Sequence, residues 1–242
     1  MTGAARGIGR SIAERLAAEG ARVACLDIRA DLLEPAVGEM RKGGLDAHAY
    51  LVDVGKRDEV HAAMQRIEAD LGDPVSILVN NALWVRYQAI EDIDEATLDR
   101  IFAVGLKGYI WPTQAAAVQM KRHGSGAVIN ISSQAALVAF EKAIGYCSLK
   151  AAVGGFTRAA AMDLGPHGIR VNAIAPGMIE TPASLGKFDQ ASLLARARVI
   201  PSRRMGQPSE IASVVAFLAS DEASYINGAM LTADGGATIA GT

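Results

Sequence analysis

Short apolar runs alternate with amphipathic segments along almost the whole chain of 242 residues. The apolar runs, which predict strands, lie at 22–26, 47–52, 76–79, 127–131, 169–175 and 229–233. The segments with apolar residues three or four apart, which predict helices, lie at 8–19, 31–42, 58–71, 96–122, 146–165 and 209–220. Strands that alternate with helices predict right-handed crossovers and a parallel sheet covered on both faces. We therefore expect an α/β fold.

Composition narrows the class of protein further. Half of the residues are hydrophobic but only 5% are aromatic, so we expect a core of Ala, Val, Ile and Leu. The formal charge is −2 with no basic block, which argues against a nucleic-acid surface. No apolar run is long enough for a membrane span or a signal peptide, so we expect a cytoplasmic protein. Cys25 and Cys147 make no disulfide framework, and the four scattered histidines predict no catalytic metal.

A glycine-rich loop opens the chain. Gly3, Gly7 and Gly9 allow a tight turn, and their free N–H groups can face a pyrophosphate at the N-terminus of the following helix. The next predicted strand ends in Asp27, close to the spacing at which an acid meets the adenosine ribose in dinucleotide folds. Glycine loops are common in turns, so the loop alone is weak evidence, but the loop and the acid together favour dinucleotide binding.

A serine, a tyrosine and a lysine form the candidate catalytic set. Tyr146 and Lys150 are four residues apart in a predicted helix, which places them on one face, and Ser133 follows the strand at 127–131. A nearby ammonium favours the phenolate, so Lys150 is expected to lower the pKa of Tyr146 from its usual ~10. Tyr146 could then exchange a proton with an alcohol or ketone, and Ser133 could bind the same oxygen. This spacing also occurs by chance on solvated helices.

Glycine loop, ribose acid and catalytic set together resemble the short-chain dehydrogenase/reductase family, in its compact form with one domain over 1–242. The further matches are Asp53-Val54, Asn80-Asn81-Ala82, the segment from Asn172 to Gly177 with Thr181, and Asp234-Gly235-Gly236. The resemblance implies a three-layer, doubly wound Rossmann-like parallel sheet. The cofactor-binding residues that it implies are Gly3, Arg6, Gly7, Ile8, Gly9, Asp27, Asp53, Val54, Asn80, Ala82, Tyr146, Lys150, Pro176, Gly177, Ile179 and Thr181.

The resemblance also implies a reaction. A hydride would pass between nicotinamide and a secondary alcohol or ketone, with Tyr146 as acid/base, Lys150 on the nicotinamide ribose and Ser133 on the substrate oxygen. The carboxylate of Asp27 would repel a 2′-phosphate, which favours NAD over NADP, although Arg6 and Arg29 lie near it in sequence. By family analogy we expect a homotetramer.

The substrate remains open at this stage. Segment 178–205 is expected to cover it, as lid loops do. The candidate pocket residues are Leu83, Trp84, Gln134, Met178 and Phe188. They leave sugars, polyols, acyl thioesters, steroids and small cyclic ketones as possible substrates, and Leu83 with Trp84 could equally pack under a neighbouring loop.

Two departures from the family pattern bear on fold and activity. The strand that usually feeds the glycine loop is largely missing, with only Met1 ahead of Thr2, so we expect the functional protein to be longer. Gly105 stands where the family has a helix asparagine. Glycine keeps the backbone carbonyl and can keep the helix irregular, so a Gly105→Asn variant is expected to change the rate only modestly. Pro112 nearby could kink the helix.

Two other functions share these motifs. A 3-oxoacyl-carrier-protein reductase would have every one of them but would normally prefer NADPH, against which Asp27 argues. A nucleotide-binding protein of the same fold without turnover would fit the missing strand and Gly105. The intact set of Ser133, Tyr146 and Lys150 argues against that second alternative.

Overall fold

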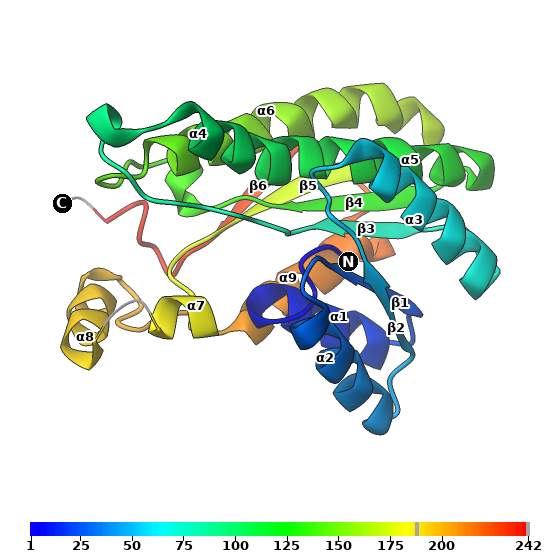
Figure 1. Ribbon diagram of the computed structural model, residues 1–242, viewed down its shortest axis with the longest axis horizontal. Coiled ribbons are helices and arrows are strands. Elements are labelled where there is room, and N and C mark those ends of the chain that lie inside the picture. The colour runs from blue at the N-terminus through cyan, green and yellow to red at the C-terminus, as the bar shows by residue number, and fades with distance from the viewer. Residues whose placement is uncertain (187–188, 241–242) are drawn as a thin grey trace.

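The computed structural model describes residues 1–186 and 189–240 (Figure 1). Its strands are β1 (Val23–Asp27), β2 (Ala47–Leu51), β3 (Ile77–Asn80), β4 (Gly126–Ile131), β5 (Ile169–Pro176) and β6 (Met230–Ala233). All pairs among them are parallel, in the orders β1-β2 and β3-β4-β5-β6. Each strand predicted from the sequence is present within about one residue of its expected bounds, and the apolar residues of β1, β3, β4 and β5 are largely buried between the two helical layers.

Helices cover both faces of this sheet. The α-helices are α1 (Gly7–Ala18), α2 (Ala30–Lys42), α3 (Arg57–Leu71), α4 (Glu95–Phe102), α5 (Gly108–His123), α6 (Ile144–Leu164), α7 (Pro182–Leu185), α8 (Gln190–Val199) and α9 (Pro208–Ala219). Figure 1 shows α4, α5 and α6 above the strands and α1, α2 and α9 below them. Helix α1 packs on α9, and α3 packs on α5. The three-layer Rossmann-like fold is therefore confirmed.

Short helical turns join these elements. They are the 3-10 turns η1 (Ile90–Asp92), η3 (Gln134–Ala136), η4 (Gly165–His167) and η5 (Asp221–Ala223), and the π-helical turn η2 (Ala103–Lys107). The helical stretch predicted over 96–122 is present as one continuous run from Glu95 to His123, in which the π-helical turn η2 stands between α4 and α5. Gly105 sits in the middle of η2, and its lack of a side chain permits this irregular backbone. Pro112 lies within α5.

Met1 and Thr2 bridge the two parts of the sheet. The amide of Leu26 donates to Met1 O at 2.8 Å, and the amide of Thr2 donates to Val79 O at 3.0 Å, so the two residues lie between β1 and β3. Towards the amino ends of these strands a cavity of about 210 Å³ separates them, lined by residues of α1, β1, α3 and β3. Met1 and Thr2 therefore join β1 to β3 only near the carboxyl ends of these two strands.

A ladder of buried polar side chains ties the sheet to the helices above it. Asn80 Nδ2 donates to Asn130 Oδ1 at 2.9 Å and to Thr113 Oγ1 at 3.1 Å, and Asn130 Nδ2 donates to Thr157 Oγ1 at 3.0 Å. These residues join β3 and β4 to α5 and α6. Because parallel strands end at one edge, the ladder fixes the helices over the edge at which the loops meet. Within the described residues, no helix is both long and apolar enough to cross a membrane.

Candidate active site

The structure brings Ser133, Tyr146 and Lys150 together at the carboxyl end of β4. Ser133 begins the turn η3, where its Oγ accepts from the amide of Ala135 at 3.1 Å. Tyr146 lies in the first turn of α6 and Lys150 one turn later. Ser132 Oγ donates to the carbonyl oxygen of Lys150 at 3.0 Å, so the end of β4 is fastened to the helix that carries the other two groups.

Lys150 is buried at the floor of the site. Its Nζ donates to Ile131 O at 2.7 Å and to Tyr109 Oη at 3.5 Å, and it lies 5.9 Å from the centroid of the Tyr146 ring. Burial disfavours an ammonium and lowers the pKa of Lys150 to about 7. The lysine is therefore held in place by neutral acceptors and titrates near neutral pH.

Tyr146 has a pKa that is raised, not lowered. Burial of the phenol raises its pKa to about 12, and a hydrogen bond with Ser133 acts in the opposite direction. The expectation that Lys150 lowers the pKa of Tyr146 is thus wrong for this structure. The physical reason is burial, because desolvation disfavours both the phenolate of Tyr146 and the ammonium of Lys150, and Lys150 itself loses its charge near neutrality. As the site stands, Tyr146 is a protonated acid.

The glycine loop forms a cradle that has no room for side chains. A Cβ on Gly9 would collide with Gly3 O, and one on Gly3, whose φ is +65°, would lie 2.8 Å from Asn81 Nδ2. Gly7 also has a positive φ, and its Cβ position faces Thr181 at 3.5 Å. Since the loop leads into the N-terminus of α1, its backbone N–H groups suit an anionic group. The cradle therefore fits the pyrophosphate of a dinucleotide.

Polar contacts hold the cradle against the sheet. Asp27 Oδ2 accepts from the amide of Ala5 at 3.2 Å, which places the expected ribose acid beside the loop. Asn81 Nδ2 donates to the carbonyl oxygens of Thr2 and Gly3, each at 3.1 Å. Arg6 is exposed before α1, and Ile8 packs against the core below the cradle. Ala82 follows Asn81 and is half-buried at the same edge.

Asn80 and Asp53, both expected to bind the cofactor, are buried in the structure. Asn80 is fully buried, and its Nδ2 donates to Asn130 Oδ1 and Thr113 Oγ1 within the polar ladder, while its Oδ1 has no hydrogen-bond partner among the described residues. Asp53 is nearly buried, and its carboxylate accepts from the amide of Gly55 at 2.9 Å and from Arg100 at 3.2 Å. Val54 is buried beside it. Asp53 and Val54 thus follow β2 at this edge of the sheet, with little of either residue exposed.

The segment after β5 closes the cradle on the other side. Pro176 ends β5, and a Cβ on Gly177 would lie 2.7 Å from Asp234 Cα, so the turn after β6 supports this glycine closely. Ile179 is buried, and Thr181 caps α7 by accepting from the amide of Ser184 at 3.2 Å. The residues expected near the nicotinamide therefore stand across from Gly7.

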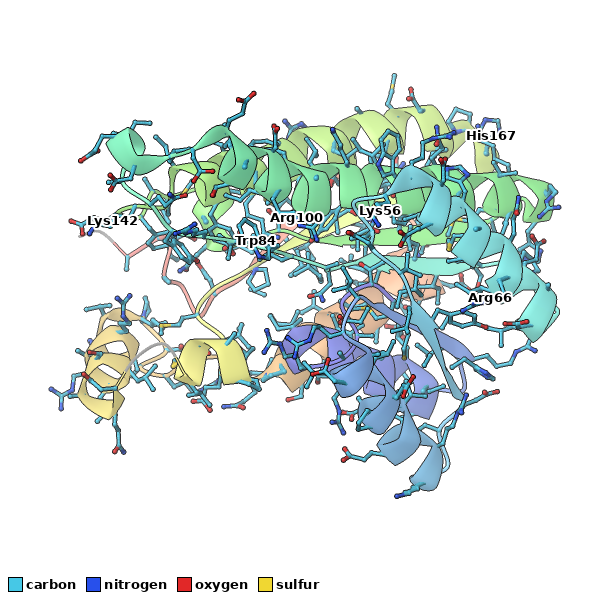
Figure 2. All side chains as sticks on the ribbon, viewed as in Figure 1. Lys56, Arg66, Trp84, Arg100, Lys142 and His167 are labelled. Carbon is cyan, nitrogen blue, oxygen red and sulfur yellow. The ribbon has the colours of Figure 1, made fainter. Side chains whose placement is uncertain are left out.

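The structure describes four of the five candidate pocket residues. Leu83 and Trp84 are exposed by 40% and 38%, and Figure 2 shows Trp84 below the layer that contains α4, α5 and α6. Of the two interpretations of this pair, exposure favours a pocket wall over packing under a loop. Gln134 Oε1 is buried with no hydrogen-bond partner among the described residues, and Met178 is half-buried. Phe188 lies outside the described residues.

Sequence reasoning missed two aromatic residues at this site. The Tyr87 ring lies 5.8 Å from the Tyr146 ring at an interplanar angle of 59°. The amide of Gln88 donates to Lys142 O at 2.8 Å, so the loop that carries Tyr87 lies on the loop before α6. Tyr109 is fully buried beside Lys150. Neither residue belongs to a motif, and only tertiary contact reveals them. In the part of the chain that is described, no group of three or more His, Cys, Asp or Glu could hold a metal ion.

Comparisons with known proteins agree with this geometry. A family model described as enoyl-(acyl carrier protein) reductase matches residues 3–238. The D-threitol dehydrogenase of Mycolicibacterium smegmatis is 38% identical over 240 residues, which are 99% of this chain and 92% of that protein. The 3-oxoacyl-[acyl-carrier-protein] reductase FabG of Staphylococcus aureus is 39% identical over 237 residues, 98% of this chain and 96% of that protein.

A solved structure gives the same result in three dimensions. The gluconate 5-dehydrogenase of Burkholderia cenocepacia, described in complex with NADP and tartrate, superposes with a TM-score of 0.93 at 32% identity. The match covers 99% of this chain and 94% of that one. Sequence, fold and the placement of Ser133, Tyr146 and Lys150 therefore lead to one conclusion: this chain belongs to the short-chain dehydrogenase/reductase family of oxidoreductases, which bind a nicotinamide cofactor.

Proposed function

We propose that the protein is an NAD(H)-dependent oxidoreductase that transfers a hydride between nicotinamide and a secondary alcohol or ketone. The observation that carries this proposal is the convergence of Ser133, Tyr146 and Lys150 beside the glycine cradle. The bound nicotinamide would supply or accept the hydride, while the protein supplies orientation and proton transfer. The cradle, Asp27 and the segment from Pro176 to Thr181 would hold it.

Each member of the set has a distinct role. Tyr146, protonated at neutral pH, donates its proton to the oxygen of a ketone as that oxygen gains negative charge. Ser133 donates to the same oxygen and stabilises the developing charge. Lys150 holds the floor of the site and orients the bound ribose. Because burial keeps the phenol protonated, the acid needed for ketone reduction is present near neutral pH, and alcohol oxidation, which needs the phenolate as base, should gain rate as pH rises.

Removal of one phenol oxygen tests the reaction. Tyr146→Phe should reduce turnover by about a thousandfold or more, since general acid catalysis and oxyanion stabilisation are both lost. NADH binding, followed by fluorescence titration, should change little. Tyr50→Phe removes a hydroxyl from β2, where it donates to Asp70 at 3.1 Å, and serves as the matched control with full activity. A wild-type protein that binds NADH but reduces no member of a broad panel of ketones would instead be a nucleotide-binding protein without turnover.

The preference for NAD over NADP rests on two side chains. Asp27 places its carboxylate at the end of β1 beside the cradle, where it would repel a 2′-phosphate. Arg29, which could otherwise attract that phosphate, donates to Asp31 through Nε at 2.8 Å and through Nη2 at 2.6 Å. Its guanidinium is thus already occupied by a carboxylate two residues away.

Two substitutions separate these contributions. Asp27→Ala should lower the ratio of kcat/KM for NAD to that for NADP by about tenfold or more, because the repulsion and the ribose contact are both lost. Asp31→Ala should raise NADP use by a smaller factor, because it frees Arg29. Steady-state kinetics with both cofactors measures the ratio. An unchanged ratio in Asp27→Ala would show that another group sets the preference.

A second candidate function is reduction of a 3-oxoacyl thioester. It is favoured by the 39% identity to the Staphylococcus aureus FabG reductase and opposed by Asp27. Assays with an acetoacetyl thioester and with small ketones and polyols, each with NADH and NADPH, distinguish the two. High activity with the thioester and NADPH would favour the acyl reductase.

The small-molecule substrate would lie under segment 178–205, which contains α7 and α8 (Figure 1). Leu83, Trp84 and Tyr87 provide apolar and aromatic surface, and a small rotation of Gln134 would let its buried amide oxygen accept from a substrate hydroxyl. This mixture suits a compact alcohol with a second hydroxyl group, and the likeness to D-threitol dehydrogenase supports the same class.

We also propose a homotetramer. Val118 on α5 and Met162 on α6 expose 61% and 80% of their surfaces, which gives the two long helices apolar groups to cover in an interface. Light scattering coupled to size exclusion would measure the assembly.

A further inference from the structure

Tyr109 stands in an unusual position for a tyrosine. It is fully buried at the start of α5, immediately after the π-helical turn η2. Its Oη donates to Ile131 O at 2.9 Å and accepts from Lys150 Nζ at 3.5 Å, and Nζ lies 5.5 Å from the centroid of its ring. The backbone beneath is fixed, because Thr113 Oγ1 donates to Tyr109 O at 2.7 Å. A buried hydroxyl thus faces the lysine of the candidate catalytic set.

The hydrogen-bond geometry makes this hydroxyl an acceptor for the lysine. A phenol has one proton, and Tyr109 gives it to Ile131 O, so its lone pairs remain for Nζ. Ile131 O accepts from both side chains, which closes a triangle of three polar groups below Tyr146. Burial raises the pKa of Tyr109 far above its usual range, so it remains a neutral dipole at every working pH.

Residue 105, in the turn before α5, has no side-chain amide that could contact Lys150. It is a glycine within η2, and a Cβ there would collide with the side chain of the buried Leu149. Leu149 directly precedes Lys150, so the space beside the lysine on this side is filled by leucine. The polar contact from the α4–α5 region to Lys150 therefore comes from Tyr109.

We propose that Tyr109 is a positioning residue for Lys150, whose neutral hydroxyl holds Nζ between Ile131 O and the Tyr146 ring. It touches neither substrate nor the reacting atoms and acts through the lysine. By accepting from the ammonium it favours the charged form of Lys150. This inference rests on the proposed function only for its effect on turnover. The contact with Lys150 can be tested in the free protein.

Few other titratable groups face this cluster. Among the described residues, Tyr109 from α5 and Tyr146 from α6 adjoin Lys150, and Tyr87 and Cys147 face Tyr146 from above. Burial raises the pKa of all three tyrosines, so none of these phenols is charged at neutral pH, and burial is also the cause that lowers the pKa of Lys150. A change in the acceptor at position 109 should therefore be visible in the titration of the lysine.

The test compares two hydroxyl deletions by NMR. Protein labelled with 15N-lysine is titrated without cofactor, and the Lys150 signal is assigned with Lys150→Met. Tyr109→Phe should lower the pKa of Lys150 by roughly half a unit to one unit, the size expected for one neutral hydrogen bond. Tyr50→Phe, which removes a hydroxyl remote from the site, should leave it unchanged.

Activity provides the second measurement. In ketone reduction, Tyr109→Phe should lower kcat by about 3- to 10-fold with KM nearly unchanged, and the alkaline limb of its pH profile should move to lower pH. If Tyr109→Phe folds poorly, wild-type protein labelled at tyrosine 13Cζ serves instead. The Tyr109 signal should then follow the titration of Lys150 and lose this response in Lys150→Met.

The outcomes are distinct. A Lys150 titration that is the same in Tyr109→Phe as in the wild type, or a Tyr109 signal that ignores Lys150, would overturn the proposal. Absence of turnover in the wild type would remove the proposed function, while the titration in the free protein would still decide the role of Tyr109.

Discussion

At the scale of single residues, burial decides the protonation of the candidate catalytic groups. Tyr146 and Lys150 lie at the spacing that suggests a lysine-activated phenol, yet burial moves the two pKa values in opposite directions, to about 12 and about 7. Desolvation always disfavours the charged form, which is the anion for tyrosine and the cation for lysine. Without a bound cofactor, Tyr146 is therefore uncharged at neutral pH and keeps the proton that it can donate to a substrate.

The depressed pKa of Lys150 has a consequence for stability. In the unfolded chain a lysine titrates near ~10.4, so between about pH 7 and pH 10 the unfolded state binds more protons. The free energy of unfolding should therefore rise with pH across this window, by about 2 kcal/mol between pH 7 and pH 9 from this residue. Urea unfolding at both pH values should show this rise in the wild type and its loss in Lys150→Met. Equal slopes in the two proteins would mean that Lys150 keeps its normal pKa.

At the scale of elements, the π-helical turn between α4 and α5 depends on one glycine and one leucine. The π-helical turn η2 brings Gly105 against Leu149 of α6 so closely that a Cβ on residue 105 would collide with both Cδ atoms of the leucine. The sequence alone predicts a modest effect for Gly105→Asn. The packing changes that prediction, because an asparagine must displace Leu149, whose neighbour in the chain is Lys150.

A double-variant cycle tests this contact. Gly105→Asn should lower the free energy of unfolding by about 1–3 kcal/mol, the usual cost of an overpacked core, and should reduce activity as well. Leu149→Ala alone should also destabilise, by about 2–4 kcal/mol through the cavity that it leaves. The pair together should be more stable than the sum of the two losses predicts, because each change makes room for the other. Strict additivity in thermal or urea unfolding would show that the two residues do not compete for space.

At the scale of the whole molecule, the sheet is held together by a short bridge. Met1 and Thr2 pair with Leu26 on one side and Val79 on the other, and the cavity of about 210 Å³ lies next to them. Side chains from helices on both faces of the sheet line this cavity, namely Leu16 of α1 and Met64 and Ile67 of α3. The cofactor cradle starts at the same bridge, so packing here supports the site directly.

Filling the cavity should stabilise the fold. Ala24 lies on β1 at the edge of the cavity, and Ala24→Val adds apolar volume there and suits a strand. We expect a gain of roughly 0.5–1 kcal/mol, seen as a higher melting temperature. Ala49→Val on β2, which does not line the cavity, is the matched control and should bring no such gain. A lower melting temperature for Ala24→Val alone would show that the wall at this position cannot accept a larger side chain.

The sequence by itself determined the order of strands and helices. Apolar runs and helical periodicity are local properties, and burial in a two-sided parallel sheet requires them. It also identified the glycine loop, Asp27 and the set of Ser133, Tyr146 and Lys150, because each belongs to a motif of fixed spacing. Gly3 and Gly9 are needed where a Cβ would collide with backbone, and Gly7 where φ is positive, so glycine at these positions can be recognised in the sequence.

Tertiary structure alone decided how these parts meet. The contacts of Tyr87 with Tyr146 and of Tyr109 with Lys150 join segments far apart in sequence, and no local pattern encodes them. The commitment of Asn80 to the core and the pKa values of Tyr146 and Lys150 depend on what surrounds each group in the folded state. Desolvation is a property of three-dimensional burial, so a sequence can name the reacting groups while only the fold sets which of them holds the proton.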